Sequence, residues 1–159
     1  MEAGEGILNI VLVEPEIPQN TGNIARTCAC IGAHLHLVEP MGFRLTERNL
    51  KRSGCDYWDD VEIRHWPSAE KFFQEHGEDS LFLFTGKSTR RFDQVSYVPG
   101  CYLVFGRESR GLDSRWLADF EQRCVRIPMC ENQRSLNVSN AVAVASYEAL
   151  QQMGFPHLV

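Results

Sequence analysis

Hydrophobic positions along the chain alternate between short continuous apolar runs and longer segments in which apolar residues recur every three or four positions. The continuous runs predict strands buried on both faces, and the spaced segments predict amphipathic helices. The expected strands are residues 7–13, 34–38, 61–66, 81–85, 101–105 and 124–127. The expected helices are residues 20–31, 46–52, 69–76, 113–120 and 138–150. Because strands and helices alternate, the pattern predicts a single-domain α/β fold, a parallel sheet with helices on both faces.

The segment from Arg134 to Leu150 joins a polar turn directly to a helix of small apolar residues. Val144 and Tyr147 extend the apolar surface of this helix beyond a single stripe. Small side chains also allow another backbone to approach closely. The helix is therefore expected either in the core or as half of a subunit interface.

Composition and charge narrow the class of protein. The chain has 159 residues, of which 43% are hydrophobic and 23% are charged, and this fits one globular core. A net charge of -5 argues against nucleic-acid binding driven by charge alone. Only three of the 16 Lys and Arg residues are lysine, however, and arginine is the better residue for forked contacts with phosphate. The cations form three groups: Arg44, Arg48, Lys51 and Arg52; Lys87, Arg90 and Arg91; and Arg107 and Arg110. The first group is equally compatible with a solvated surface.

Other sequence features bear on location and metal binding. No apolar run reaches the roughly 20 residues of a membrane span, and the N-terminus lacks the basic start of a signal peptide. A cytoplasmic location is therefore expected. The six cysteines show no Cys-x-x-Cys spacing and are expected to be buried free thiols. A zinc site formed by Cys28, Cys30 and His34 is a less favoured alternative.

Loops that follow the expected strands are the places to look for chemistry, because open α/β sheets bind ligands where strands end. The first such loop, residues 14–26, contains two prolines and leads into a helix that carries Arg26. Asn20 or Thr21 is expected to cap this helix, whose free amide groups would suit a phosphate. An ordinary capped helix with an exposed arginine explains the same residues.

Two more loops are chemically unusual. Residues 106–111 form a polar turn bounded by glycines, and they match neither the P-loop nor the Rossmann glycine pattern. Gly106 would let a nucleotide approach closely, although a plain strand-to-helix connection explains this loop equally well. Residues 127–137 lead into the last helix, where Ser135 or Asn137 can serve simply as the N-cap.

Together these three loops resemble the signature motifs of the SPOUT class of methyltransferases, which are knotted RNA-modifying enzymes. The resemblance extends to the small, single-domain tRNA (cytidine/uridine-2′-O-)-methyltransferases of the TrmL or YibK type. It covers residues 7–159, so that residues 1–6 are expected to be an N-terminal extension or a remnant of expression. The segments that carry it are residues 9–24, 39–43, 105–112 and 126–129.

The resemblance implies properties that the residue pattern does not predict. It implies a deep C-terminal trefoil knot, which general topology rules would have rejected. It also implies a homodimer that contacts tRNA across both subunits, and S-adenosylmethionine as cofactor, with no metal, no DNA and no membrane as partners. The residues that the resemblance assigns to the cofactor are Phe84, Thr85, Gly106, Glu108, Ile127, Met129, Ser135 and Leu136.

The implied reaction is methylation of the ribose 2′-oxygen of a wobble cytidine or uridine, with leucine tRNAs as the expected substrates. The resemblance assigns Arg26 and Asn20 to catalysis, at the 2′-hydroxyl and the adjacent phosphate. Arginine is a poor general base near neutral pH, so we expect Arg26 to hold the phosphate, which could itself accept the proton. Asn137, Arg110 and Arg134 are expected to contact the substrate.

Two alternatives remain open from the sequence. The same catalytic domain could act on another RNA, such as ribosomal RNA. A protein of a different class, a nucleotide-binding module without catalysis on a flavodoxin-like sheet, would show the same alternation of strands and helices but no methyl transfer.

Overall fold

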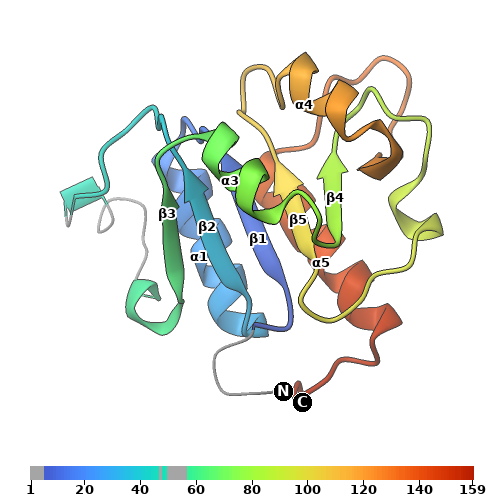
Figure 1. The fold of residues 1–159 in the computed structure, drawn as a ribbon. Coiled ribbons are helices and arrows are strands. Elements are labelled where there is room, and N and C mark those ends of the chain that lie inside the picture. The colour runs from blue at the N-terminus through green and yellow to red at the C-terminus, as the bar shows by residue number, and fades with distance from the viewer. Residues whose placement is uncertain (1–5, 47, 50–56) are drawn as a thin grey trace.

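A computed structural model describes residues 6–46, 48–49 and 57–159. In this part of the chain six strands form one sheet in the order β3-β2-β1-β5-β4-β6, and every pairing is parallel (Figure 1). The strands are β1 Asn9–Val13, β2 His34–Val38, β3 Ile63–Trp66, β4 Leu81–Phe84, β5 Tyr102–Phe105 and β6 Cys124–Val125. Each strand lies within its predicted range, so the predicted parallel α/β sheet is confirmed.

The position of β1 in the sheet decides which loops meet. In a flavodoxin-like sheet the first strand lies between the second and third strands. Here β1 lies between β2 and β5, and Leu12 is in register with Leu37 on one side and with Phe105 on the other. The flavodoxin-like alternative is therefore wrong. Because β1 and β5 are adjacent and parallel, the loops that follow them leave the same edge of the sheet side by side.

Helices cover both faces of the sheet, as predicted. The helices α1 Pro18–Ile31 and α5 Val138–Gln152 lie on one face, and α3 Ala69–His76 and α4 Ser114–Asp119 lie on the other (Figure 1). Alternation along β1 shows the two layers, because Ile10 packs in the cluster with α1 and α5 whereas Val11 packs with α3 and α4. Short 3-10 helices lie at Trp58–Asp60 (η1), Phe92–Gln94 (η2) and Glu121–Arg123 (η3).

Local capping explains where several helices begin. Ser68 Oγ accepts a hydrogen bond from the amide of Lys71 at 3.1 Å and caps α3, whose predicted start at residue 69 is confirmed. Asn137 Oδ1 accepts from the amide of Ser139 at 2.9 Å at the start of α5. The prediction for α1 was wrong, because that helix begins at Pro18 and has Ile17 as its N-cap residue. Proline has no amide hydrogen and suits the first position of a helix. Because the helix begins at Pro18, Asn20 and Thr21 lie within its first turn and neither caps it.

The cysteines are buried less uniformly than predicted. Cys28, Cys101 and Cys124 are buried, Cys30 and Cys130 are exposed, and Cys55 lies outside the described residues. Cys28 and Cys30 differ because two residues correspond to about 200° around an α-helix. Burial raises the pKa of the Cys28 thiol to about 12, whereas Cys30 points to the opposite side of α1. The two thiols therefore do not form a zinc site with His34.

The order of the strands does not test three further expectations. Most of the predicted helix at residues 46–52, including Lys51 and Arg52, lies outside the described residues. Among the described residues, no helix is long and apolar enough to span a membrane. The threading of the C-terminal segment into a trefoil knot stays a prediction.

Candidate active site

Asn20 lies at the centre of a chain of hydrogen bonds that joins the three polar loops. It is on the first turn of α1, and only 6% of it is exposed. Its Nδ2 donates to Oε1 of Glu108 at 3.3 Å, and its Oδ1 accepts from Nδ2 of Asn137 at 3.1 Å. These three residues come from the segments that follow β1, β5 and β6 respectively. The structure therefore brings together three residues that sequence analysis placed in three separate motifs.

The first and second loops are bound to each other by reciprocal contacts. The carboxylate of Glu108 accepts from the amides of Glu16 at 2.8 Å and Ile17 at 3.1 Å. The carboxylate of Glu16 in turn accepts from the amide of Ser109 at 3.0 Å and from its Oγ at 2.7 Å. The backbone N–H of Ser109 is the main cause that lowers the pKa of Glu16. Because Glu108 occupies the two amides that precede α1, the predicted phosphate site at this helix start is not supported.

An ion pair also joins the first and second loops. Nη1 of Arg107 is 2.9 Å from Oε2 of Glu14, and both side chains are largely buried. Residues 107, 108 and 109 thus each contact the first loop. We call the contacts between residues 14–17 and residues 107–109 the loop clasp.

Gly106 is required by the path of its own chain. A Cβ atom at this position would lie 2.2 Å from the carbonyl carbon of Gly111 and 2.2 Å from the nitrogen of Leu112. The turn closes here through the amide of Gly111, which donates to the carbonyl of Arg107 at 2.8 Å. The space beside Gly106 is therefore filled by the backbone of residues 111–112, which differs from the predicted role of leaving room for a nucleotide.

Apolar residues lie at the ends of the adjacent strands β5, β4 and β6. Phe84 stacks on Phe105 with ring centroids 4.7 Å apart. Beyond them Ile127 and Met129 are half-buried, and Leu136 is 41% exposed. Apolar walls with nearby backbone groups suit a nucleoside base, which needs shape and hydrogen bonds more than charge.

Backbone contacts bring the remaining predicted cofactor residues to the same edge. The amide of Thr85 donates to the carbonyl of Val125 at 3.0 Å. A Cβ on Gly86 would come within 4.0 Å of the carbonyl oxygen of Arg134, so the turn after β4 lies beside the third loop. Ser135 follows directly and is exposed. The apolar side chains and the turns that meet at this edge therefore fit an adenosine-containing cofactor.

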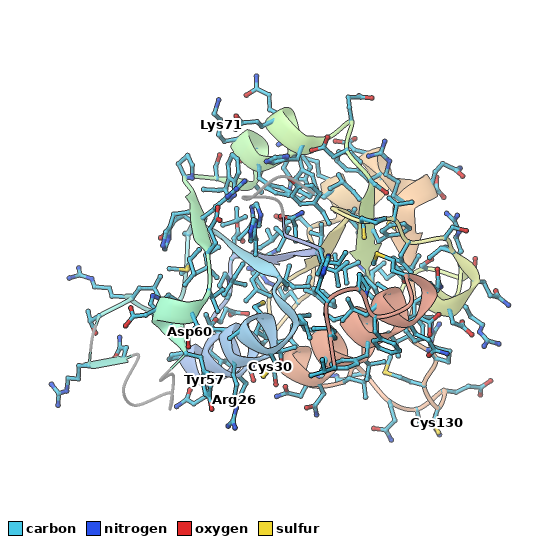
Figure 2. All side chains as sticks on the ribbon, turned by 90° about the horizontal axis from the view of Figure 1, so that it is seen from below. Arg26, Cys30, Tyr57, Asp60, Lys71 and Cys130 are labelled. Carbon is cyan, nitrogen blue, oxygen red and sulfur yellow. The ribbon has the colours of Figure 1, made fainter. Side chains whose placement is uncertain are left out.

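Arg26 lies apart from this cluster of loops. It follows Asn20 by six residues, which leaves the two side chains about 120° apart around the helix. Arg26 is exposed, and its guanidinium carbon is 5.0 Å from the centre of the Tyr57 ring. Figure 2 shows this pair on one side of the molecule and Cys130, in the third loop, on the other. Sequence analysis missed Tyr57. The only feature of the sequence that points to it is its place a few residues after the first group of cations, residues 44–52.

The cations of the second and third groups, and Arg134, differ in their partners. Arg107 is held by Glu14, and Arg91 is held by the carboxylate two residues further along. Arg110 and Arg134 are exposed. These two side chains, on the second and third loops, are therefore accessible from solvent.

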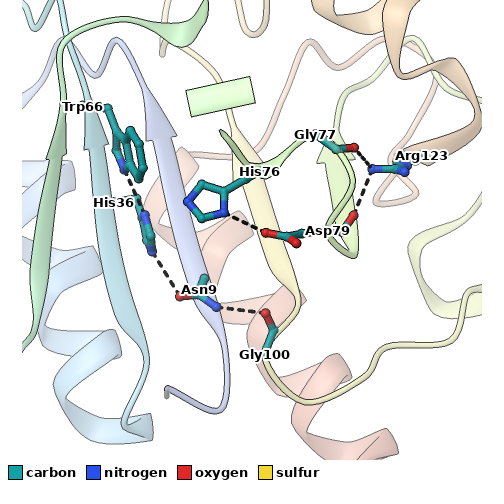
Figure 3. A network of polar contacts seen from close by, with 8 residues as sticks. All are labelled: Asn9, His36, Trp66, His76, Gly77, Asp79, Gly100 and Arg123. Carbon is teal, nitrogen blue, oxygen red and sulfur yellow. Dashed lines mark hydrogen bonds and ion pairs between the residues drawn. The ribbon is translucent and has the colours of Figure 1, made fainter. Parts of the chain in front are cut away.

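A separate polar cluster lies on the face of the sheet that α3 covers (Figure 3). Nδ1 of the fully buried His36 accepts from the indole N–H of Trp66 at 3.0 Å, and its Nε2 lies 3.1 Å from Oδ1 of Asn9. Asn9 in turn donates to the carbonyl of Gly100 at 2.9 Å. Burial is the main cause that lowers the pKa of His36 to about 3. The imidazole is therefore neutral, with its proton on Nε2. Across the described ranges, no three His, Cys, Asp or Glu side chains lie close enough to hold a metal ion.

The polar loops at the carboxyl edge of a parallel sheet place this protein among α/β proteins that bind ligands where their strands end. Residues 7–147 match the SpoU rRNA Methylase family, and the chain belongs to that family. The resemblance to SPOUT methyltransferases inferred from the three loops is thereby confirmed.

Individual relatives and solved structures extend the comparison. The chain is 46% identical over 155 residues to the tRNA (cytidine(34)-2'-O)-methyltransferase of Escherichia coli strain K12, covering 96% of this chain and 98% of the relative. A solved structure described as "Structural insights into the 2-OH methylation of C/U34 on tRNA" is 43% identical, with a TM-score of 0.87 over 95% of this chain and 99% of that chain. The SpoU methyltransferase AviRb from Streptomyces viridochromogenes, solved in complex with the cofactor AdoMet, has a TM-score of 0.80 at 22% identity. The match covers 95% of this chain and 59% of AviRb, and it shows a shared fold.

Proposed function

We propose that this protein transfers a methyl group from S-adenosylmethionine to the ribose 2′-oxygen of the wobble nucleotide of tRNA, cytidine or uridine, with leucine tRNAs as the first substrates to test. The observation that carries the proposal is the hydrogen-bonded chain from Glu108 through Asn20 to Asn137, which joins the three loops at one edge of the sheet. The similarity to the Escherichia coli tRNA enzyme over nearly the whole of both chains supports the substrate class.

S-Adenosylmethionine, when bound, supplies a methyl group on a positively charged sulfur. The residues proposed to hold it are those that line the ends of β4, β5 and β6. Half-buried Ile127 and Met129 offer apolar contact, and the turns at Thr85 and Gly106 offer backbone groups. Ser135 and Leu136 would close the site from the end of the third loop, directly before α5. The complex of AviRb with AdoMet, in the same fold, supports this choice of cofactor.

On the RNA side, we propose that Arg26, which lies apart from the loops of its own chain, holds a phosphate of the bound tRNA. Its exposed guanidinium, always charged near neutral pH, can neutralise a phosphate but is a poor proton acceptor. Asn20 and Asn137 are proposed to order the loops around the ribose, while Arg110 and Arg134 contact the RNA backbone. In-line placement of the 2′-oxygen and the methyl carbon would then supply much of the rate enhancement.

We further propose that the working form is a homodimer in the cytoplasm, where its tRNA substrate is found. On α5, Val144 is 44% exposed and Tyr147 is 49% exposed, although both are large and apolar. Exposed apolar residues grouped on one helix face are typical of a subunit interface. A dimer would also combine the exposed arginines of two acidic chains into one RNA-binding face.

The test is transfer of labelled methyl from S-adenosylmethionine to tRNA, followed by nuclease digestion and mass spectrometry of the nucleosides. The expected product is 2′-O-methylcytidine or a 2′-O-methyluridine derivative at the wobble position. Arg26→Ala should abolish turnover and leave cofactor affinity unchanged. Arg115→Ala is the matched control, because Arg115 is an exposed arginine on α4 that pairs with Glu70.

Each negative result has a distinct meaning. Cofactor binding without methylation of any tRNA would contradict the tRNA proposal and direct the search to other RNAs, such as ribosomal RNA. Absence of cofactor binding would contradict the proposed chemistry. Full turnover by Arg26→Ala would remove Arg26 from the mechanism.

A further inference from the structure

The start of α1 is held by residues from outside the helix. The helix has no side-chain cap of its own and no acidic residue in its first turn, and Pro18 has no amide. The two amides just before it are both bound by the carboxylate of Glu108, at 2.8 and 3.1 Å, from 92 and 91 residues further along the chain. The start of α1 is therefore bonded to the second loop.

The loop clasp holds the first loop in both directions. The amide of Glu16 donates to Glu108, while the carboxylate of Glu16 accepts two hydrogen bonds from Ser109. The ion pair of Arg107 with Glu14 lies on the same segment. One flexible contact would allow sliding, but several contacts from three consecutive residues restrict the relative position of the two loops.

The same clasp reaches the third loop through Asn20. The amide group of Asn20 is bonded to Glu108 on one side and to Asn137 on the other. Asn20 is also buried, so the atoms expected to touch substrate are already bonded within the protein. A change at Glu108 therefore acts on all three loops at once.

We infer that Glu16 and Glu108 are positioning residues that set α1, and with it Arg26, relative to the proposed cofactor loop. This inference rests on the proposed function for the chemistry that Arg26 performs. A helix moves nearly as a rigid body, so a displacement of its start also displaces Arg26. Misplacement of a reacting group by about 1 Å can lower a rate by about 100-fold. The role differs from the cofactor contact that the resemblance assigned to Glu108.

The experiment compares Glu16→Ala and Glu16→Gln with the control Glu70→Ala. Glu70 is an exposed carboxylate on α3 that pairs with Arg115, outside the site. Single-turnover methyl transfer at saturating cofactor and tRNA should fall about 10- to 100-fold in Glu16→Ala, while the dissociation constant for the cofactor stays within about 2-fold of that of the wild-type protein. Glu16→Gln should retain more activity, because its amide oxygen can still accept from the N–H of Ser109. Glu70→Ala should behave as wild type.

Two results would overturn the inference. One is an unchanged single-turnover rate in a folded Glu16→Ala protein. The other is a loss of rate that saturating cofactor fully restores, since Glu16 would then contribute to cofactor binding instead of positioning. If Glu16→Ala does not fold, Ser109→Ala removes only the shorter of the two bonds to Glu16 and should give a smaller loss of the same kind.

A second measurement separates this inference from the proposed function. Amide hydrogen exchange at residues 19–26 should slow when S-adenosylhomocysteine binds to the wild-type protein, because the clasp connects the cofactor loop to α1. The slowing should be largely lost in Glu16→Ala. If that result is obtained but no tRNA is methylated, the proposed function fails and the clasp stands. Equal slowing in both proteins would refute the clasp even if tRNA is methylated.

Discussion

The guanidinium of Arg26 lies over the ring of Tyr57, with Cζ 5.0 Å from the ring centroid. Tyr57 immediately precedes η1, so a residue about 30 positions away in the sequence provides the surface on which the arginine rests. An arginine held over an aromatic ring loses less freedom when it binds a phosphate than one that is fully solvated. The pair therefore prepares Arg26 for its proposed contact with RNA.

Tyr57→Leu should lower methyl transfer, because it removes the aromatic face. A cation–π contact worth about 0.5 to 2 kcal/mol corresponds to a loss of about 2- to 30-fold. Tyr57→Phe keeps the ring and should retain nearly full activity. Rates measured for both variants under single-turnover conditions check this, and equal losses in the two would assign the effect to the hydroxyl group instead of the ring.

Gly106→Ala should destabilise the protein and disturb the second loop. The new methyl group would overlap the backbone of Gly111 and Leu112, and the expected cost is about 1 to 3 kcal/mol or more. Gly86→Ala is the matched comparison for stability, since its Cβ would meet no atom closer than 4.0 Å. Urea denaturation of both variants measures the difference. Equal stability of the two would contradict the tight turn seen at Gly106.

Tyr147→Glu should convert the proposed dimer into monomers, because it places a charge in the apolar surface of α5. A central interface residue contributes about 2 kcal/mol or more, so dissociation should become at least about 30-fold more favourable. Val98→Glu is the control, since Val98 is 45% exposed but lies in a loop outside α5. Light scattering at micromolar concentration gives the molar mass of each. A monomeric wild-type protein, or dissociation of both variants alike, would refute the interface on α5.

His36 should make the protein less stable as the pH falls below neutrality. An unfolded histidine binds a proton below about pH 6.5, whereas burial keeps the pKa of folded His36 at about 3. Between these two values the unfolded state binds the extra proton, so this residue lowers the free energy of unfolding by about 1.4 kcal/mol for each pH unit of acidification. The contribution is fully present above about pH 6.5 and is lost progressively towards pH 3.

His36→Leu should show a shallower fall in stability between pH 6.5 and 5, where most carboxylates do not yet titrate. Burial also lowers the pKa of His34, so this residue too lowers the free energy of unfolding in acid, in the wild-type protein and in the variant alike. At neutral pH the variant should be less stable by about 1 to 3 kcal/mol, because Asn9 Oδ1 and the Trp66 N–H lose their partner. Urea titrations at each pH provide both values, and parallel pH dependences would rule out His36 as the source.

Local patterns predicted much of this molecule. The strand at 34–38 and the helix at 69–76 both have the predicted bounds, and Ser68 and Gly77 flank that helix. Both depend on burial periodicity and capping, which involve residues only a few positions apart. The three motif loops were also recognisable, because their glycine, proline and polar residues interrupt those patterns.

The sequence by itself determined the elements, the parallel α/β class and the loops in which the site residues lie. Only the tertiary structure decided that Glu108 holds the start of α1, that Asn20 connects two other loops, and that Tyr57 supports Arg26. The physical reason is distance along the chain. A carboxylate 92 residues from its partner amide meets it only because β1 and β5 pair side by side, and that pairing is a property of the whole sheet.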